Sequence, residues 1–248
     1  QSYSSLGATS HTFNVYAIDP SGNADTTPAS YTWTIDTTPP TLAITGAATI
    51  NNANVTMYAV SGTCSENLRT VSVSIGSVNT SGTCNGATFT ATAANVSAVS
   101  DGTVTVSVSY TDAAGNSANT SLMVTKDTGN PTVSITAASI TNANKLAYGV
   151  TGNCSDMMRT VSVTIGGLPA TGTCNGTSYA TNTIDVTTLT DGSIAINASI
   201  SDTAGNSGNA TTNVTKDTVA PALTLNALAV INFANRLNYG IGGNCESL

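Results

Sequence analysis

The cysteines of this chain recur with a period of about 90 residues. Cys64 and Cys154 are 90 positions apart, and Cys154 and Cys245 are 91 apart. The segments that lead to these cysteines repeat as well: Ile50 to Cys64, Ile140 to Cys154 and Ile231 to Cys245. Solenoid repeats are usually about 20 to 50 residues long, whereas about 90 residues is the size of a complete small domain. The period therefore predicts a linear array of small domains.

Two further repeated phrases mark where each domain ends. Asp-x-x-Gly-Asn occurs at 19–23, 112–116 and 202–206, and a phrase with Asp-Thr and proline follows at 36–40, 127–131 and 217–221. Glycine and asparagine tolerate positive φ, so the first phrase predicts a tight hairpin. Proline prevents strand pairing, so the second predicts a domain boundary.

These boundaries divide the chain into four expected parts. Residues 1–37 are expected to hold the last two strands of a truncated immunoglobulin-like domain, and 218–248 the first two strands of a further one. Residues 38–127, called the first repeat below, and 128–217, called the second repeat, are expected to be complete domains. We expect the parent chain to be much longer than the segment shown.

Apolar residues alternate with hydroxyl-bearing residues inside each repeat, which is the period of a half-buried strand. No segment has a helical period. Turn signals divide the first repeat into seven expected strands, at 41–45, 55–63, 69–75, 77–81, 87–93, 103–110 and 119–126. Seven short strands in about 90 residues predict an all-β fold of tandem immunoglobulin-like sandwiches.

The five cysteines are best explained as two disulfides and part of a third. The expected pairs are Cys64 with Cys84 and Cys154 with Cys174, while the partner of Cys245 is expected outside the chain. Zinc is the rival interpretation, but each repeat has two cysteines and the chain has a single histidine, so four ligands cannot be assembled within a repeat. Disulfides require an oxidising compartment, and we therefore expect a secreted or cell-surface protein.

Composition excludes several classes of function. The net charge is −7 and the six Lys and Arg residues form no basic run, so nucleic acid is not an expected partner. No apolar stretch approaches the roughly 18 residues of a membrane span. His11 stands alone, and the carboxylates are spread over turns. We expect His11 at the surface or a strand edge, and no enzyme activity.

Calcium is the one metal that the positions of acids favour. The acids lie after the first cysteine of each repeat (Glu66, Asp156 and, in the last segment, Glu246), in the hairpin turn (Asp112, Asp202) and in the preceding linker (Asp36, Asp127). Strands traced up and down place all three classes at the N-terminal pole of a repeat. Ca²⁺ takes six to eight oxygen ligands. The alternative is that these acids cap turns, end strands or are simply solvated.

A tyrosine recurs before the first cysteine of each repeat, at Tyr58, Tyr148 and Tyr239. Each shares its strand face with an apolar residue two positions later. We expect these tyrosines in the core with the hydroxyl at the edge of the sandwich, rather than on a platform for stacking sugars.

The turn phrase, followed by a strand and Asp-Thr with proline, resembles the bacterial Ig-like repeats of large surface adhesins. The resemblance implies a surface location, and relatives often hold calcium at domain junctions. The repeated cysteine pair is a departure, since many relatives lack cysteine. The expected function is the structural stalk or shaft of a long cell-surface adhesin or extracellular filament, with neighbouring repeats as partners. The alternatives are an adhesive module that binds a glycan or host protein, and a sheath subunit that packs against lateral copies.

Overall fold

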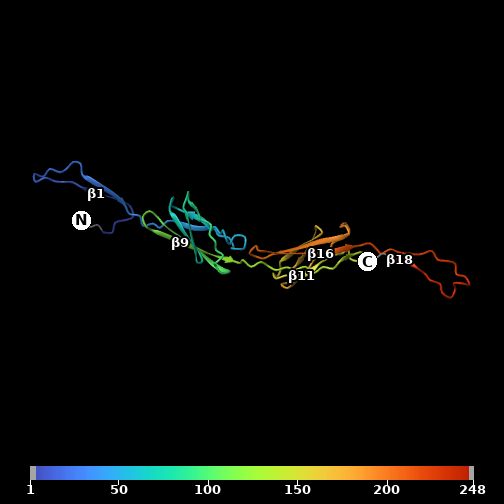
Figure 1. Cartoon of the computed structure of the whole chain (residues 1–248). Helices are drawn as coiled ribbons and strands as arrows, with labels where there is room; N and C mark the ends of the chain where they lie inside the picture. The colour runs from blue at the N-terminus through green and yellow to red at the C-terminus, as the bar shows by residue number, and fades with distance from the viewer. Residues whose placement is uncertain (1–3, 246–248) are drawn as a thin grey trace. The chain divides into compact units, whose positions relative to one another are not determined.

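The computed structural model describes residues 4–245, which contain strands and turns and, within that range, no helix. The chain divides into two compact units, Gln1–Gly129 and Asn130–Leu248. Figure 1 shows the strands of both. The predicted all-β, immunoglobulin-like fold is confirmed.

Two antiparallel sheets make the sandwich of the first unit. The first contains β3 (Leu42–Gly46), β4 (Ser61–Cys64) and β7 (Thr88–Thr90), in that order. The second contains β6 (Val78–Thr83), β5 (Thr70–Ile75), β8 (Gly102–Thr111) and β9 (Ser117–Lys126), in that order. Alternate residues of the long strands point inward, as Val104, Val106 and Val108 do on β8, and are buried between the sheets. Their neighbours on the outer face are mostly serine, threonine and asparagine.

Two strands of the first repeat are shorter in the structure than the sequence predicts. The segment expected as a strand from 55 to 63 is strand only from Ser61, because the asparagines before it cap turns with their side chains. The Asn54 side chain accepts a hydrogen bond from the Asn51 N–H (2.9 Å) and donates one to the Thr49 carbonyl (2.9 Å). The segment expected as a strand from 87 to 93 is strand only at Thr88–Thr90. The fourth expected strand is present as β6, which pairs with β5 in the larger sheet through a short turn at Gly76, whose φ is +57°.

Both open sides of the first sandwich are bridged between the sheets. Ile50 pairs in parallel with Lys126 at one side, and Gly82 pairs with Ala91 at the other. Unpaired edge strands are sites of unwanted association. Each bridge pairs backbone groups that would otherwise lie at an open edge of the domain.

Gly62 on β4 is a point of close approach between strands. It pairs across the sheet with Phe89 on β7, whose ring lies where a side chain would otherwise be. A Cβ atom there would also collide with the Ala43 carbonyl oxygen. Gly152 pairs in the same way with Tyr179 in the second unit. An aromatic ring that covers a cross-strand glycine is a recognised device in sheets.

Replacing Gly62 by alanine is expected to destabilise the first repeat by about 2 kcal/mol, the usual range for overpacking. Denaturant unfolding measures the loss. Thr63→Ala, at the adjacent exposed position, is the control and should stay within about 0.5 kcal/mol of wild type. Equal stability of the two variants would contradict the predicted clash.

The second unit repeats this architecture in its own residues. One sheet contains β10 (Ile140–Thr141), β16 (Ser207–Asp217), β15 (Gly192–Ser201), β12 (Thr160–Ile165) and β13 (Leu168–Thr173), in that order. The other pairs β11 (Thr151–Asn153) with β14 (Ser178–Ala180). A separate apolar cluster fills the space between them. Each unit therefore has its own core.

Each unit also contains a hairpin outside its sandwich. In the first unit β1 (Ser10–Val15) pairs with β2 (Ala29–Thr34), and in the second β17 (Leu223–Leu225) pairs with β18 (Gly243–Cys245). His11 lies on β1 opposite Trp33, with the ring centroids 5.8 Å apart. Its Nε2 atom is 2.8 Å from the Gly7 carbonyl oxygen. The histidine thus packs and bonds within the hairpin.

The recurring tyrosines are core residues in both repeats. Tyr58 and Tyr148 are each 2% exposed. Their hydroxyls donate to the carbonyls of Ala48 and Ala138 respectively, which lie on the segment leading into the asparagine-rich turn. Burial raises the pKa of both phenols. The core position predicted for these two tyrosines is confirmed.

Candidate functional site

Three acids predicted to share one pole of the first repeat lie close together in the structure. Asp36 follows β2 by two residues, Glu66 lies in the loop after β4, and Asp112 follows β8. One carboxylate oxygen from each lies within 4.8 Å of the other two. This group of Asp36, Glu66 and Asp112 is called the acidic triad below. Its members are separated by up to 76 residues in sequence, so only the strand order brings them together.

Asp112 is held by its own turn. Its Oδ1 atom accepts the N–H groups of Ala114 (2.9 Å) and Asn116 (2.7 Å), and its Oδ2 atom accepts the Asn116 side-chain amide (2.9 Å). Burial opposes ionisation of this carboxyl, but the hydrogen bonds from Asn116 outweigh it, and the pKa of Asp112 lies below its usual value. The turn therefore keeps a buried carboxylate charged at the centre of the triad.

The same turn is tied to the linker that precedes the repeat. Asn116 donates its side-chain amide to the Asp36 carbonyl oxygen at 3.1 Å. The Asp36 side chain in turn accepts the Thr38 N–H at 2.9 Å, which fixes the start of the linker as a turn. Asp-x-x-Gly-Asn thus does more than close a hairpin, since its last residue fastens the preceding segment.

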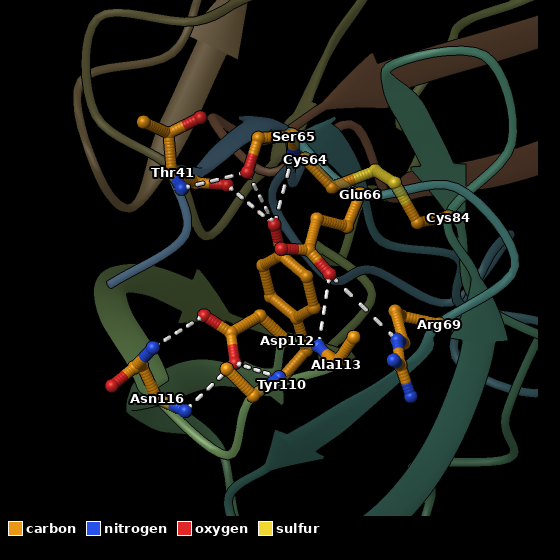
Figure 2. Close-up of polar contacts among 11 residues, drawn as sticks. Thr41, Cys64, Ser65, Glu66, Arg69, Cys84, Tyr110, Asp112, Ala113 and Asn116 are labelled. Atoms are coloured by element: carbon orange, nitrogen blue, oxygen red, sulfur yellow. Dashed lines mark hydrogen bonds and ion pairs between the residues drawn. A yellow bond between two sulfur atoms is a disulfide. The ribbon is translucent and has the colours of Figure 1, made fainter. Parts of the chain in front are cut away.

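Glu66 is positioned from two sides. Its Oε2 atom accepts the Ala113 N–H at 3.1 Å and lies 3.7 Å from Arg69 Nε. Figure 2 shows Glu66 reaching from its loop towards the Asp112 turn. Three carboxylates therefore meet beside one guanidinium, an arrangement that leaves negative charge and oxygen ligands suitable for a hard cation.

Tyr110 supports the Glu66 loop from below and was not anticipated from the sequence. Its hydroxyl donates to the Thr41 carbonyl (3.1 Å) and accepts the Ser65 N–H (2.9 Å) (Figure 2). In the second repeat this position is Ile200, and a tyrosine stands instead at the position of Phe89, where the Tyr179 hydroxyl donates to the Ser134 carbonyl (2.9 Å). Each repeat thus ties its first segment, around Thr41 or Ser134, with one tyrosine that comes from a different strand in each repeat. Alignment of the two repeats reveals the exchange.

Both predicted disulfides are present. Cys64 bonds to Cys84 and Cys154 to Cys174, each with 6.0 Å between the Cα atoms. Figure 2 shows the first bond beside Glu66. Backbone hydrogen bonds reinforce it, because Leu68 N–H donates to the Cys84 carbonyl and Cys84 N–H to the Arg69 carbonyl, both at 2.8 Å. Cys245 is an exposed free thiol in the described chain, and its disulfide stays a prediction.

The corresponding acids of the second repeat belong to different units. Asp127 lies in the first unit, whereas Asp156 and Asp202 lie in the second. Asp202 repeats the capped turn, accepting the Asn206 N–H and side-chain amide at 2.8 Å each. Asp156 accepts the Ser155 hydroxyl at 2.6 Å. Their grouping with Asp127 stays a prediction, and Glu246 lies outside the described residues.

A second polar cluster, missed from the sequence, lies at the opposite pole of each repeat. Lys126 at the end of β9 is 3% exposed, and its ammonium lies 2.5 Å from Asp101 Oδ1. The Asp101 Oδ2 atom also accepts the N–H of Thr128, the second residue after β9, at 2.9 Å. This trio is called the Lys-Asp-Thr clasp below. It fastens the outgoing linker to the body of the repeat.

The second repeat has the same clasp. Lys216 lies 2.8 Å from Asp191 Oδ1, and Asp191 Oδ2 accepts the Thr218 N–H at 3.0 Å. In the sequence, the aspartate of the clasp is followed by glycine at the start of one long strand. The lysine and threonine of the clasp are the first and third residues of a Lys-Asp-Thr triplet at the end of the next strand. The hydrogen bond from Lys126 is the main cause that lowers the pKa of Asp101 to about 2, and the pKa of Asp191 is lowered for the same reason.

Comparison with known proteins identifies the type of domain. Residues 2–88 match the bacterial Ig-like domain (group 3). The predicted resemblance to bacterial Ig-like repeats is confirmed for this part of the chain. Comparison with curated proteins gives no match. Over its described residues, the chain has no helix long and apolar enough to cross a membrane.

Several solved structures are similar to this chain. One is a Ca²⁺-stabilised adhesin with which an Antarctic bacterium binds ice (23% identity, 89% of this chain and 60% of that one, TM-score 0.46). Another is a tetra-tandem repeat from the extending region of a large adhesion protein (24% identity, 92% of this chain and 62% of that one, TM-score 0.37). A third is from a 1.5-MDa bacterial ice-binding adhesin (20% identity, 86% of this chain and 76% of that one, TM-score 0.43). The chain thus spans less than two thirds of the first two structures.

Proposed function

We propose that this chain is part of the stalk or shaft of a long bacterial surface adhesin or extracellular filament. The observation that carries the proposal is the repetition, in both repeats, of a separate core, a disulfide and a clasp on the outgoing linker. These are devices that hold a domain together and fix where its linker leaves. The partners in this proposal are neighbouring repeats of the same chain, at the cell surface or beyond it.

Electron microscopy of the native assembly tests this proposal. A shaft is expected to be a continuous thin fibre whose spacing equals one repeat, decorated along its length by antibodies against the first repeat. An isolated compact particle would contradict it. Antibody bound at the fibre tip alone would instead favour the adhesive-module alternative.

We further propose that the acidic triad binds Ca²⁺ and so fixes the linker before the first repeat. Asp36 belongs to the linker, whereas Glu66 and Asp112 belong to the body of the repeat, so a shared cation would join the two. Ca²⁺ accepts carboxylate, carbonyl and water oxygens together, so water molecules can complete the ligand set that the three carboxylates begin.

Calcium at ten times its dissociation constant is expected to stabilise the first repeat by about 1.4 kcal/mol. Glu66→Gln should weaken calcium binding at least tenfold, since it removes a charged ligand while keeping an acceptor for the Ala113 N–H. Asp25→Asn is the matched control, because Asp25 is an exposed acid outside the triad whose side chain caps Thr27. Titration calorimetry and thermal unfolding measure both effects. Equal binding by the two variants, or no stabilisation at 10 mM Ca²⁺, would contradict the site.

A further inference from the structure

We propose that the outer face of the large sheet in each repeat binds a neutral polysaccharide. In the first repeat a shallow groove runs over β6, β5, β8 and β9, and on the last three of these strands it is lined outward by Ser72, Ser74, Ser107, Ser109, Asn119 and Ser121. In the second repeat a groove lies over β12, β15 and β16, lined outward by Ser162, Thr164, Asn197, Ser199, Asn209 and Thr211. The two sets correspond position by position, each 90 residues apart.

The chemistry of both grooves is that of a polyol surface. Every outward side chain just named carries a hydroxyl or an amide, and these groups both donate and accept hydrogen bonds. In the second groove Asn197 is oriented by its neighbours, since its side chain accepts the Thr211 hydroxyl at 2.9 Å and donates to the Thr164 hydroxyl at 3.4 Å. A row of fixed donors and acceptors suits a ligand whose own groups are hydroxyls.

Charge selects an uncharged ligand. None of the described residues that line either groove is charged, although the whole chain carries a net charge of −7. The acids lie elsewhere, in the acidic triad and the clasps at the poles. An anionic polysaccharide would meet no Lys or Arg in the groove and would be repelled by the net charge. A neutral polysaccharide needs no cationic partner and is not repelled by the net charge of the protein.

Shape favours a linear chain over a second copy of the protein. Both faces are hollowed, so two copies placed face to face would leave a gap between them, whereas a narrow chain molecule lies along a groove. Neither groove has an aromatic side chain among its described lining residues, so each groove alone is expected to bind weakly. Repetition along the chain raises the overall avidity without any new contact.

Affinity electrophoresis of the full chain tests this proposal. The gels contain hydroxyethyl cellulose, dextran or galactomannan, with alginate as the anionic comparison. At least one neutral polymer is expected to slow wild-type protein. The double variant S109K/S199K, which places a long charged side chain in each groove, should lose at least tenfold in apparent affinity. T103K/S193K is the matched control, because Thr103 and Ser193 are exposed on the same strands, carry the same change and lie outside the grooves.

Three outcomes of this experiment would contradict the proposal. It is wrong if no neutral polymer slows the wild-type protein, if both double variants bind equally, or if alginate is preferred. Sedimentation separates the remaining case: concentration-dependent self-association that S109K/S199K abolishes would assign these faces to a second copy of the chain. Circular dichroism and thermal unfolding confirm that both variants fold. None of these results bears on the shaft proposal, which rests on the disulfides, cores and linkers.

Discussion

Replacing Cys64 and Cys84 by alanine is expected to lower the free energy of unfolding of the first repeat by about 3 kcal/mol. The bond closes a loop of 20 residues, and the chain-entropy model gives roughly this stabilisation for a loop of that length. Chemical denaturation, followed by a probe placed in the first repeat, measures the loss. The C154A/C174A variant is the matched control and should destabilise the second repeat instead.

Reduction of the wild-type protein separates the cross-link from packing. Both sulfurs of the first bond are deeply buried, with Cys64 3% and Cys84 0% exposed, so the alanine variant also loses packing contacts. Reduced wild type keeps those contacts, and its unfolding in the presence of a thiol should show most of the loss. If the reduced protein were as stable as the oxidised one, the bond would have no stabilising role.

The same bond has a mechanical consequence that single-molecule pulling measures. While it is intact, the 20-residue loop cannot extend when the repeat unfolds. Reduction should therefore lengthen each unfolding step by about 70 Å, the reach of 20 extended residues. Steps of unchanged length after reduction would contradict a role in limiting extension of the shaft.

Removing Asp101 is expected to destabilise the first repeat clearly, because it leaves the Lys126 ammonium buried without its charged partner. The two side chains differ sharply in exposure, 3% for Lys126 and 43% for Asp101. Lys126→Met should therefore cost less than Asp101→Ala, since it leaves a carboxylate that water still reaches. The double variant D101A/K126M should recover much of the loss. Thermal and denaturant unfolding of the three variants measure this double-mutant cycle. If the losses in free energy of unfolding of the two single variants simply added in the double variant, the two side chains would not be coupled.

The clasp also predicts a dependence on pH. The folded pKa of Asp101 is about 2, whereas an unfolded aspartate titrates near 3.9. Because the folded value is the lower one, the contribution is complete above about pH 4 and is lost as the pH falls from about 4 towards 2. D101A/K126M should lose less stability over this window than wild type. Parallel curves for the two proteins would contradict the assignment.

Much of the fold follows from sequence pattern alone, because alternation has a direct physical meaning. The apolar residues at every second position of 103–110, three valines and a tyrosine, must face a core if the segment is a strand, and β8 has that form. The prediction of a strand over 55–63 was wrong for the first part of the segment, because hydrogen bonds from asparagine side chains favour turns there over strand pairing. Asn51 and Asn54 satisfy backbone groups with their own side chains, so turns replace the first part of that strand.

The acidic triad shows how much of a site can be predicted from the spacing of residues in the sequence. The repeat of acids after a cysteine, in a turn and in a linker was visible in the sequence, and tracing the strands up and down placed the three at one pole. Tyr110 gave no such signal, since its position is isoleucine in the other repeat. Its role depends on which carbonyl its hydroxyl reaches, and that is a matter of packing between strands far apart in sequence.

The sequence by itself determined the period, the strand-rich repeats, the cysteine pairs and the acids that share a pole, because each of these is written in local spacing and repeats along the chain. Tertiary structure alone decided that Lys126 is buried against Asp101, that Asn116 holds the carbonyl of Asp36, and that hydroxyls gather over shallow grooves. These contacts join residues from different strands. Their energies depend on burial and distance, which no one-dimensional pattern records.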